Sequence, residues 1–415
     1  MVINMRKKQL IACIAACCVL GAAVMTGCSQ GSSNDKAPQK TSAQTEAAAK
    51  EEAEEDKSEE AENGGEKAEE KTAGTEGSTR TIIDHNGNEV VLPAEINRVV
   101  ISGILPLPSV FCQFRGSAKE IVGIHPSSMA AAENSYLVKV YPEILDADTS
   151  FVENGSINIE QLLTLDPDVV FYSAANSEER ELFAKAGIPC VGFSTTIADY
   201  DCVETYAQWI ALFGEIYGKQ ETANEIIEDG RRTAEEISAI TETIPSEERP
   251  NVLIIFNYAN GAMTTAGSHF FSEYWLDKAG ANNVAAELTG TAEINMEQVY
   301  EWDPDIILIT NFSPYLPEDL LNNTIDGYDW SGVSAVKNGQ VYKFPLGMYR
   351  WFPPASDTPL VLMWLAKTIQ PERFADLDLD ARIKNFYQTH YHVALSDEEL
   401  ETIYHPAREA SGVKQ

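Results

Sequence analysis

The sequence predicts an α/β protein of two lobes, each built on a parallel sheet, joined by one long helix. The first observation is a stretch that occurs twice, as INIEQLLTLDPDVVFY over 157–172 and as INMEQVYEWDPDIILI over 294–309. The second is an alternation of strand-like and helix-like segments, which is typical of parallel sheets covered by helices. The third is a helical pattern over 219–243, which lies between the two copies.

Each copy encodes a short helix, a turn and a strand. Asn158 and Asn295 suit an N-cap, and a Gln stands three residues after each, as in a capping box. Asp-Pro-Asp ends each helix, because Pro disfavours the helical region for the residue before it. VVFY and IILI predict strands buried on both faces. Glu160 and Glu297 fall in the first turn, where the helix dipole stabilises a carboxylate; alternatively, they form a matched pair that faces a common partner.

Composition limits the class of protein. The chain has 415 residues with 44% apolar residues, enough for two domains of ordinary size. Its formal charge of -34 argues against nucleic acid as a partner, because phosphate binding requires a basic face.

The N-terminal region predicts export. Residues 1–28 combine three early cations with an apolar run, as a signal peptide does, and they end in Met-Thr-Gly-Cys, which resembles the bacterial lipobox. By that resemblance Cys28 becomes the lipidated first residue; the alternative is an uncleaved anchor helix. Either form holds the protein at the extracytoplasmic face of the cell membrane. Residues 29–79 are rich in Glu, Ala, Lys, Ser and Gly, and we expect a disordered acidic linker.

The rest of the chain divides into an N-terminal lobe over 80–218, a connecting helix over 219–244, a C-terminal lobe over 245–385 and a helical tail over 386–415. In the first lobe we predict a hairpin over 81–92 and strands over 98–102, 121–124, 169–172 and 189–193. In the second lobe we predict strands over 252–256, 306–309 and 341–345.

Three cysteines remain after the lipidation site, namely Cys112, Cys190 and Cys202. Their number is odd and no CxxC spacing occurs, so a thiolate zinc site is not expected. We interpret all three as small apolar core residues.

At this point the chain resembles the class III substrate-binding lipoproteins of ABC importers, which serve ferric siderophores, haem and cobalamin. The resemblance covers roughly 80–383. It rests on the opening TIIDHNGNEVVLP, the two copies, the long central helix and WSGVSAVKNGQVYKFP at 330–345. It implies two Rossmann-like lobes around a shallow cleft. It also implies that Glu160 and Glu297 contact Arg residues of the permease, and we expect a monomer.

The ligand is expected beyond the carboxyl ends of the strands, where open parallel sheets bind ligands. The residues that we expect there are Tyr349, Arg350, Trp351, Asn257, Tyr258, Phe312, Tyr315, His125 and Ser128. An Arg side chain offers a planar fork of donors to carboxylate, catecholate or phosphate oxygens, and the flanking aromatic rings offer stacking area. The alternative is that Arg350 lies on the rim and that the rings pack in the core.

The cargo expected from the sequence is a whole metal chelate, a ferric siderophore first, with no resident cofactor. Binders of bare metal ions use several converging His and carboxylate side chains, and too few His stand at plausible positions here. A haem would require an axial ligand, for which Met348, Met129, His125 or His269 are the candidates. The alternatives for the cargo are a corrinoid, haem, or an oxyanion such as molybdate.

Two other classes of function compete with binding. An anchored hydrolase is one, but the sequence contains no GxSxG, HExxH, Walker A or GxGxxG motif, so no enzymatic activity is expected. A surface adhesin is the other, and it would not require two copies of a helix that begins with Glu.

Overall fold

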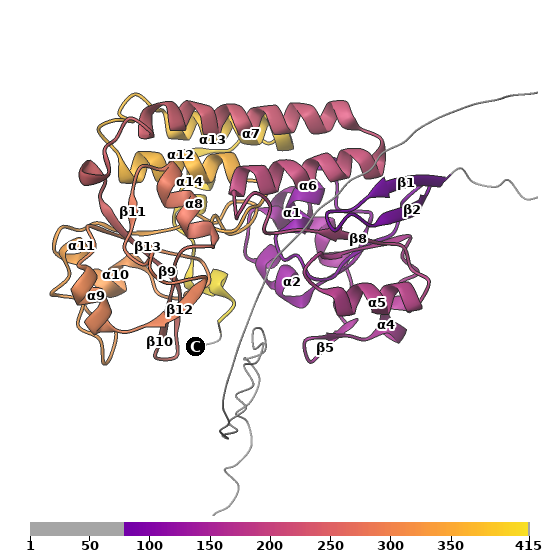
Figure 1. The fold of residues 1–415 in the computed structure, drawn as a ribbon, viewed down its shortest axis with the longest axis horizontal. Helices are drawn as coiled ribbons and strands as arrows, with labels where there is room; N and C mark the ends of the chain where they lie inside the picture. Colours follow the sequence, from indigo (N-terminus) through magenta and orange to yellow (C-terminus); the bar gives the residue numbers. More distant parts are fainter. Residues whose placement is uncertain (1–78, 414–415) are drawn as a thin grey trace, which may run out of the picture. The chain divides into compact units, whose positions relative to one another are not determined.

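Two separate sheets organise the chain, and each contains one copy of the repeated stretch (Figure 1). The computed structural model describes residues 79–413. The predicted signal peptide, the predicted lipidation site Cys28 and the predicted linker up to residue 78 lie outside the described residues. The first described residue, Thr79, already belongs to a strand, so the predicted end of the linker at residue 79 is wrong.

The first lobe contains the predicted hairpin and a four-stranded parallel sheet. The hairpin pairs β1 (Thr79–Ile83) with β2 (Glu89–Pro93). The sheet has the order β4-β3-β7-β8 and consists of β3 (Val99–Ile101), β4 (Ile121–Ile124), β7 (Val169–Ser173) and β8 (Cys190–Phe193). Its strands are short and almost completely buried, as the unbroken apolar runs predict.

Short helices and one small ribbon connect these strands. The ribbon pairs β5 (Val152–Glu153) with β6 (Ser156–Ile157). The helices are α1 (Leu107–Arg115), α2 (Pro126–Glu133), α3 (Leu137–Val140), α4 (Ile159–Thr164) and α5 (Ser177–Lys185).

Two long helices lead from the first lobe to the second. They are α6 (Cys202–Tyr217) and α7 (Gln220–Thr241), which pack against each other. The break falls at Gly218, whose φ of 62° is a left-handed conformation that a glycine adopts without strain. The predicted connecting helix is thus α7.

The second lobe contains a six-stranded mixed sheet. Its parallel part is β9 (Asn251–Ala259), β13 (Ile306–Ile309) and β14 (Val341–Lys343), with the short β11 (Asn282–Asn283) beside β9. Two antiparallel strands, β10 (Ala262–Ala266) and β12 (Thr291–Ile294), extend it at the β9 edge. The sequence did not predict these two, because AMTTA and TAEI are small and polar and lack the strong apolar character of the central strands.

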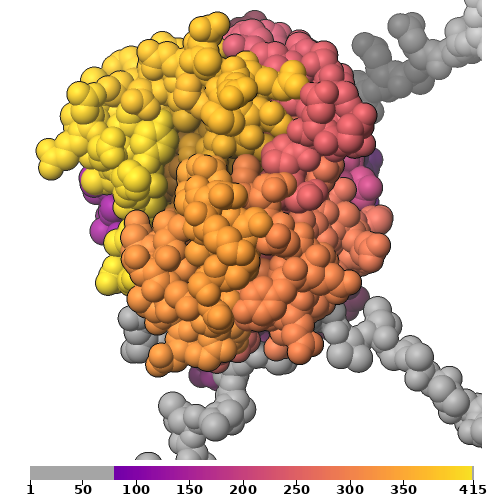
Figure 2. Space-filling model, turned by 90° about the vertical axis from the view of Figure 1, so that its left-hand side faces the viewer, coloured from indigo at the N-terminus to yellow at the C-terminus, as the bar shows by residue number. Residues whose placement is uncertain are grey.

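Helices cover this sheet and continue beyond it. They are α8 (Phe271–Lys278), α9 (Met296–Trp302), α10 (Pro317–Leu321), α11 (Ser334–Lys337), α12 (Thr358–Ile369), α13 (Leu379–Tyr391) and α14 (Asp397–Tyr404), followed by a 3-10 turn, η3 (Arg408–Ser411). Figure 2, which faces the second lobe, shows the chain from α12 onward in gold to yellow, lying against the orange part of that lobe.

The predicted boundary between the second lobe and a tail at 385/386 is wrong, because it falls inside α13. This helix is joined to α7 by a bidentate ion pair in which the Arg382 guanidinium donates to Glu236 at 3.1 and 2.8 Å. Further on, Glu399 of α14 accepts a hydrogen bond of 2.7 Å from the hydroxyl of Tyr136, which lies in the first lobe. The C-terminal helices are therefore integral to the fold.

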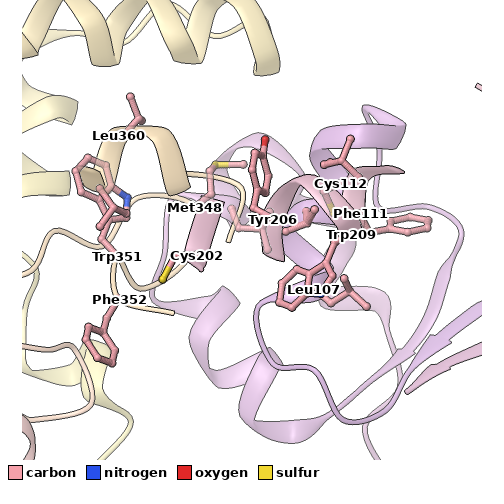
Figure 3. Close-up of a cluster of buried hydrophobic side chains, with 14 of the residues drawn as sticks. Leu107, Phe111, Cys112, Cys202, Tyr206, Trp209, Met348, Trp351, Phe352 and Leu360 are labelled. Atoms are coloured by element: carbon pink, nitrogen blue, oxygen red, sulfur yellow. The ribbon is translucent and has the colours of Figure 1, made fainter. Parts of the chain in front are cut away.

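One hydrophobic core runs through both lobes. It contains residues of β3 and β7 from the first sheet, of β9 and β13 from the second, and of α6, α7 and α12 between them. Cys112 and Cys202 are fully buried in it as free thiols, which confirms their interpretation as core residues (Figure 3). Cys190 is only partly buried and packs against a separate cluster of the first lobe. Across the described range 79–413, no helix is both long and apolar enough to cross a membrane.

Candidate functional site

The two copies of the repeat begin their helices in nearly the same way. Asn295 and Gln298 form the full predicted capping box, with bonds of 3.1 Å in both directions. In the first copy Asn158 accepts from the Gln161 N–H at 3.1 Å, but the return bond from Gln161 is absent. Glu160 and Glu297 are exposed, one in each lobe. In Figure 1 their helices α4 and α9 both lie along the edge opposite α7.

The strand ends of the second lobe bring Arg350 and Phe312 together. Phe312 follows β13 and Arg350 follows β14, and the guanidinium carbon lies 4.5 Å from the centre of the Phe312 ring, a cation–π distance. Asn311 joins the same two strand ends, since its amide donates to the carbonyls of Phe344 and Pro345 at 2.8 and 2.9 Å. Three partly exposed rings, Phe256, Phe270 and Phe312, lie side by side at this edge.

Arg350 is nearly enclosed, with 5% of its surface exposed. Its Nη2 donates to the backbone carbonyls of Ala410 and Ser411, both at 3.1 Å. Its Nε is buried and has no hydrogen-bond partner among the described residues. An unsatisfied buried donor costs free energy, so this atom would gain from an oxygen ligand.

The rings on either side of Arg350 are core residues, which corrects the expectation that they offer stacking area. Trp351 is fully buried and its indole N–H donates to Asp357 at 2.8 Å (Figure 3). Tyr349 is 3% exposed and packs against Ala131 and Ala355. The backbone turns sharply at Gly347, whose φ is 55°, and the residues that follow fold back into the interior.

Tyr258 and Tyr315 lie together in a second hydrophobic cluster of the C-terminal lobe, apart from the main core that contains Phe352. Their ring centres are 4.6 Å apart, and Tyr258 is fully buried beside Trp330. The predicted end of this strand at residue 256 is wrong, because β9 continues to Ala259 and pairs with β10. Asn257 is consequently an exposed residue within a hairpin.

The candidates from the first lobe help to begin α2. His125 is its N-cap, and its Nδ1 accepts from the Ser127 N–H at 3.0 Å. Burial lowers the pKa of His125 below its ordinary value, which favours the neutral ring. Ser128 is buried and its hydroxyl donates to the Leu105 carbonyl at 3.1 Å. Both side chains therefore have structural partners.

Two charged residues near Arg350 were not singled out from the sequence. Asp357 is fully buried and accepts from the Met348 N–H, the Trp351 indole and the Tyr391 hydroxyl. Lys343 donates to the carbonyls of Ser313 and Tyr315; burial first, and then the charges of Arg408 and Arg350, lower its pKa to about 7. An Asp before a helix and a Lys inside a strand are common surface patterns, so nothing in the sequence singled them out.

Direct metal binding finds no support in the described part of the chain. Among residues 79–413 no group of three or more His, Cys, Asp or Glu side chains could hold a metal ion. Met348, one candidate axial ligand for haem, is fully buried in the core. A groove of about 800 Å³ lies between α1, α3, α7 and α13, away from the strand ends.

Comparison with known proteins shows which family and which solved structures the chain resembles. Residues 118–346 match the family described as periplasmic binding protein. The molybdate-binding protein MolA of Haemophilus influenzae is 28% identical over 330 residues, covering 75% of this chain and 91% of MolA. The solved structure of MolA bound to molybdate is 26% identical, with a TM-score of 0.64, and the match covers 76% of this chain and 99% of MolA.

A solved periplasmic solute binding protein of Veillonella parvula is also similar. It is 33% identical with a TM-score of 0.72, and the match covers 79% of this chain and 97% of that protein. The predicted two-lobed α/β fold is confirmed by these similarities and by the two sheets.

Proposed function

The chain belongs to the periplasmic binding protein family, and from that premise we propose that it captures a small anion at Arg350 and delivers it to a permease. It is a substrate-binding protein of an ABC importer, and its relatives bind solutes. The observation that carries the choice of an anion is the buried guanidinium on Phe312, whose Nε has no partner. An anionic oxygen would supply a charge-assisted hydrogen bond there.

An oxyanion is the first candidate for the cargo. The burial of Tyr349 and Trp351 removes two of the rings that a broad, flat ligand would use at this strand edge. Arg350 and Arg408 bring two cations to this edge, opposed by the Asp319 carboxylate. The amine of Lys343, whose pKa is lowered to about 7, adds a partial positive charge at neutral pH. The relative MolA, named a molybdate-binding protein, also favours an oxyanion as the cargo.

A ferric chelate, such as a ferric siderophore, is the second candidate. The observation that favours it is the row of partly exposed rings Phe256, Phe270 and Phe312, which offers some apolar area beside the cation. In either case the metal arrives as part of the cargo and the protein has no resident cofactor.

We also propose that the protein works as a monomer at the extracytoplasmic face of the cell membrane, held by a lipid on Cys28. The support is the sequence of the N-terminal region, in which an apolar run ends in Met-Thr-Gly-Cys. Mass spectrometry of the mature protein would test this, because the lipid adds a defined mass to a chain that begins at Cys28.

A titration of tryptophan fluorescence tests the cargo. Molybdate, a ferric siderophore, haem and a corrinoid are added separately, and we expect saturation with molybdate and weak or no response to haem and the corrinoid. Arg350→Ala should abolish the response, and Arg350→Lys should weaken it, because Lys has no fork of donors. Arg373→Ala, which changes an exposed ion pair with Glu248, is the matched control. Unchanged binding by Arg350→Ala would contradict the proposal.

A further inference from the structure

The segment that follows α14 lies directly on Arg350, and we propose that residues 408–413 form a strap that occupies the anion site until the cargo displaces it. This inference rests on the proposed function, since it takes Arg350 as the anchor of the cargo. In the part of the chain shown in Figure 1, the segment is the yellow end that descends past the second sheet. Ala410 and Ser411, whose carbonyls reach Arg350, are themselves 3% and 9% exposed.

The geometry of the guanidinium explains why strap and cargo exclude each other. An arginine binds an oxyanion in a bidentate way through one of two pairs of donor atoms, called forks here: Nε with Nη2, or Nη1 with Nη2. Nη2 belongs to both forks. In this structure Nη2 donates to Ala410 and to Ser411, so neither fork is free for a bidentate contact. An oxyanion that binds through Nε and Nη2 must therefore replace at least one strap carbonyl.

Replacing the strap by an oxyanion is favourable for Nε of Arg350, which has no hydrogen-bond partner while the strap is in place. Nε is buried without a partner while the strap is in place, and a bound oxyanion would accept from it. The carbonyls of Ala410 and Ser411 would return to water when the strap lifts, where they find new partners. The strap thus opposes binding without blocking it permanently.

One ion pair holds the strap down. Arg408 donates to both carboxylate oxygens of Asp319, at 2.5 and 2.8 Å, and to the Pro314 carbonyl at 3.3 Å. Ser411 closes the turn, since its hydroxyl donates to the Arg408 carbonyl at 2.8 Å. Beyond it, Gly412 has a φ of 71°. These few bonds can open locally without unfolding the lobe.

Binding measurements on two variants test the strap. With molybdate and with a ferric siderophore as probes, a chain that lacks residues 408–415 should bind the recognised probe about tenfold tighter than the full chain, or more. Arg408→Ala keeps the strap carbonyls but removes the ion pair, so it should give a smaller gain. Arg382→Ala, which removes an exposed ion pair of α13, should leave the affinity unchanged.

The outcomes separate the two proposals. Equal affinity of the full and shortened chains, or weaker binding by the shortened chain, would overturn the strap while leaving the anion site in place. Binding by neither chain would overturn both.

Limited proteolysis supplies a second measurement on the unaltered protein. Trypsin cuts after Arg408 only when the strap is lifted, so a saturating probe should accelerate this cleavage several-fold. Cleavage after Arg373, on the exposed surface, should not respond to the probe. Protection of the bond after Arg408 by the probe, or an unchanged rate, would contradict displacement.

Discussion

Asp168 and Asp305 make the same pair of hydrogen bonds in their separate lobes. The Asp168 N–H donates to the Arg98 carbonyl at 2.8 Å, and its carboxylate accepts from the Arg98 N–H at 2.9 Å. The Asp305 N–H donates to the Asn251 carbonyl at 2.8 Å, and its carboxylate accepts from the Asn251 N–H at 2.9 Å. Each carboxylate thus joins the starts of two neighbouring parallel strands, β3 with β7 and β9 with β13.

This relationship predicts matched losses of stability. Asp168→Ala and Asp305→Ala should each lower the free energy of unfolding by about 1–3 kcal/mol, because each leaves a strand-leading N–H without its charged acceptor. Urea unfolding followed by circular dichroism measures the loss. Asp376→Ala, at an exposed position of the second half of the chain, is the control. No change in either carboxylate variant would show that the strand pairing alone sets the register.

The pair of exposed carboxylates predicts a defect in transport that spares binding. Reversing both charges, with Glu160→Arg and Glu297→Arg, should reduce uptake at least about tenfold, because a docking surface of complementary charge becomes repulsive. Cargo affinity should stay the same. Glu301→Arg changes an exposed carboxylate of the same helix α9 and is the matched control. Normal uptake by the double variant would remove the docking role from both residues.

Asp357 predicts a pH dependence of stability. Burial raises its pKa from 3.8 to about 6, although the Met348 N–H and the Trp351 indole stabilise its charge. The folded state therefore binds the proton more tightly than the unfolded state does. The stabilisation from this group is complete below pH about 4 and is lost as the pH rises through about 6, by up to about 3 kcal/mol.

Urea unfolding at pH 4.5, 5.5 and 7 measures this effect as a difference. The free energy of unfolding of the native chain, relative to Asp357→Asn, should fall as the pH rises across this range. Asp376→Asn should show no such trend against the native chain. A constant difference for Asp357→Asn would contradict a raised pKa.

Lys343 predicts the opposite slope at higher pH. Burial and the nearby charges of Arg408 and Arg350 lower its pKa from 10.5 to about 7, so the unfolded state binds more protons between these values. The free energy of unfolding should rise with pH from about 7 to about 10. Lys343→Met should flatten the rise, and Lys185→Met, on the surface of α5, should not. Equal slopes in the native chain and Lys343→Met would show that the amine keeps an ordinary pKa.

The secondary structure could be predicted from the sequence where strong apolar runs and capping patterns indicated the same element. The repeated Asn, the Asp-Pro-Asp stop and the buried strand behind it each formed as predicted, and α7 begins and ends within a few residues of its predicted bounds. β12, at the edge of the sheet, and its neighbour β10 were missed because their segments are small and polar and carry little apolar character. The boundary at 385/386 failed because α13 has no break in its helical pattern there.

The site was harder to predict because the position of a residue in the chain does not show whether its side chain is buried. Arg350 follows a strand end as expected, yet its neighbours Tyr349 and Trp351 face the interior, a consequence of the turn at Gly347. Whether an aromatic ring faces a ligand or a core depends on what packs above it. Tyr349 packs against Ala131 of the first lobe. The segment that covers Arg350 lies about sixty residues later in the chain, at Ala410 and Ser411. No local pattern relates the two.

The main hydrophobic core, which runs through both lobes, makes the two halves of the chain depend on each other. The copies at α4 and α9 still carry the same start, but Ile226 and Ile237 of α7 and Leu360 of α12 now share one interior with both sheets. Cutting the chain after residue 244 would expose this interior in both fragments, and each would tend to aggregate.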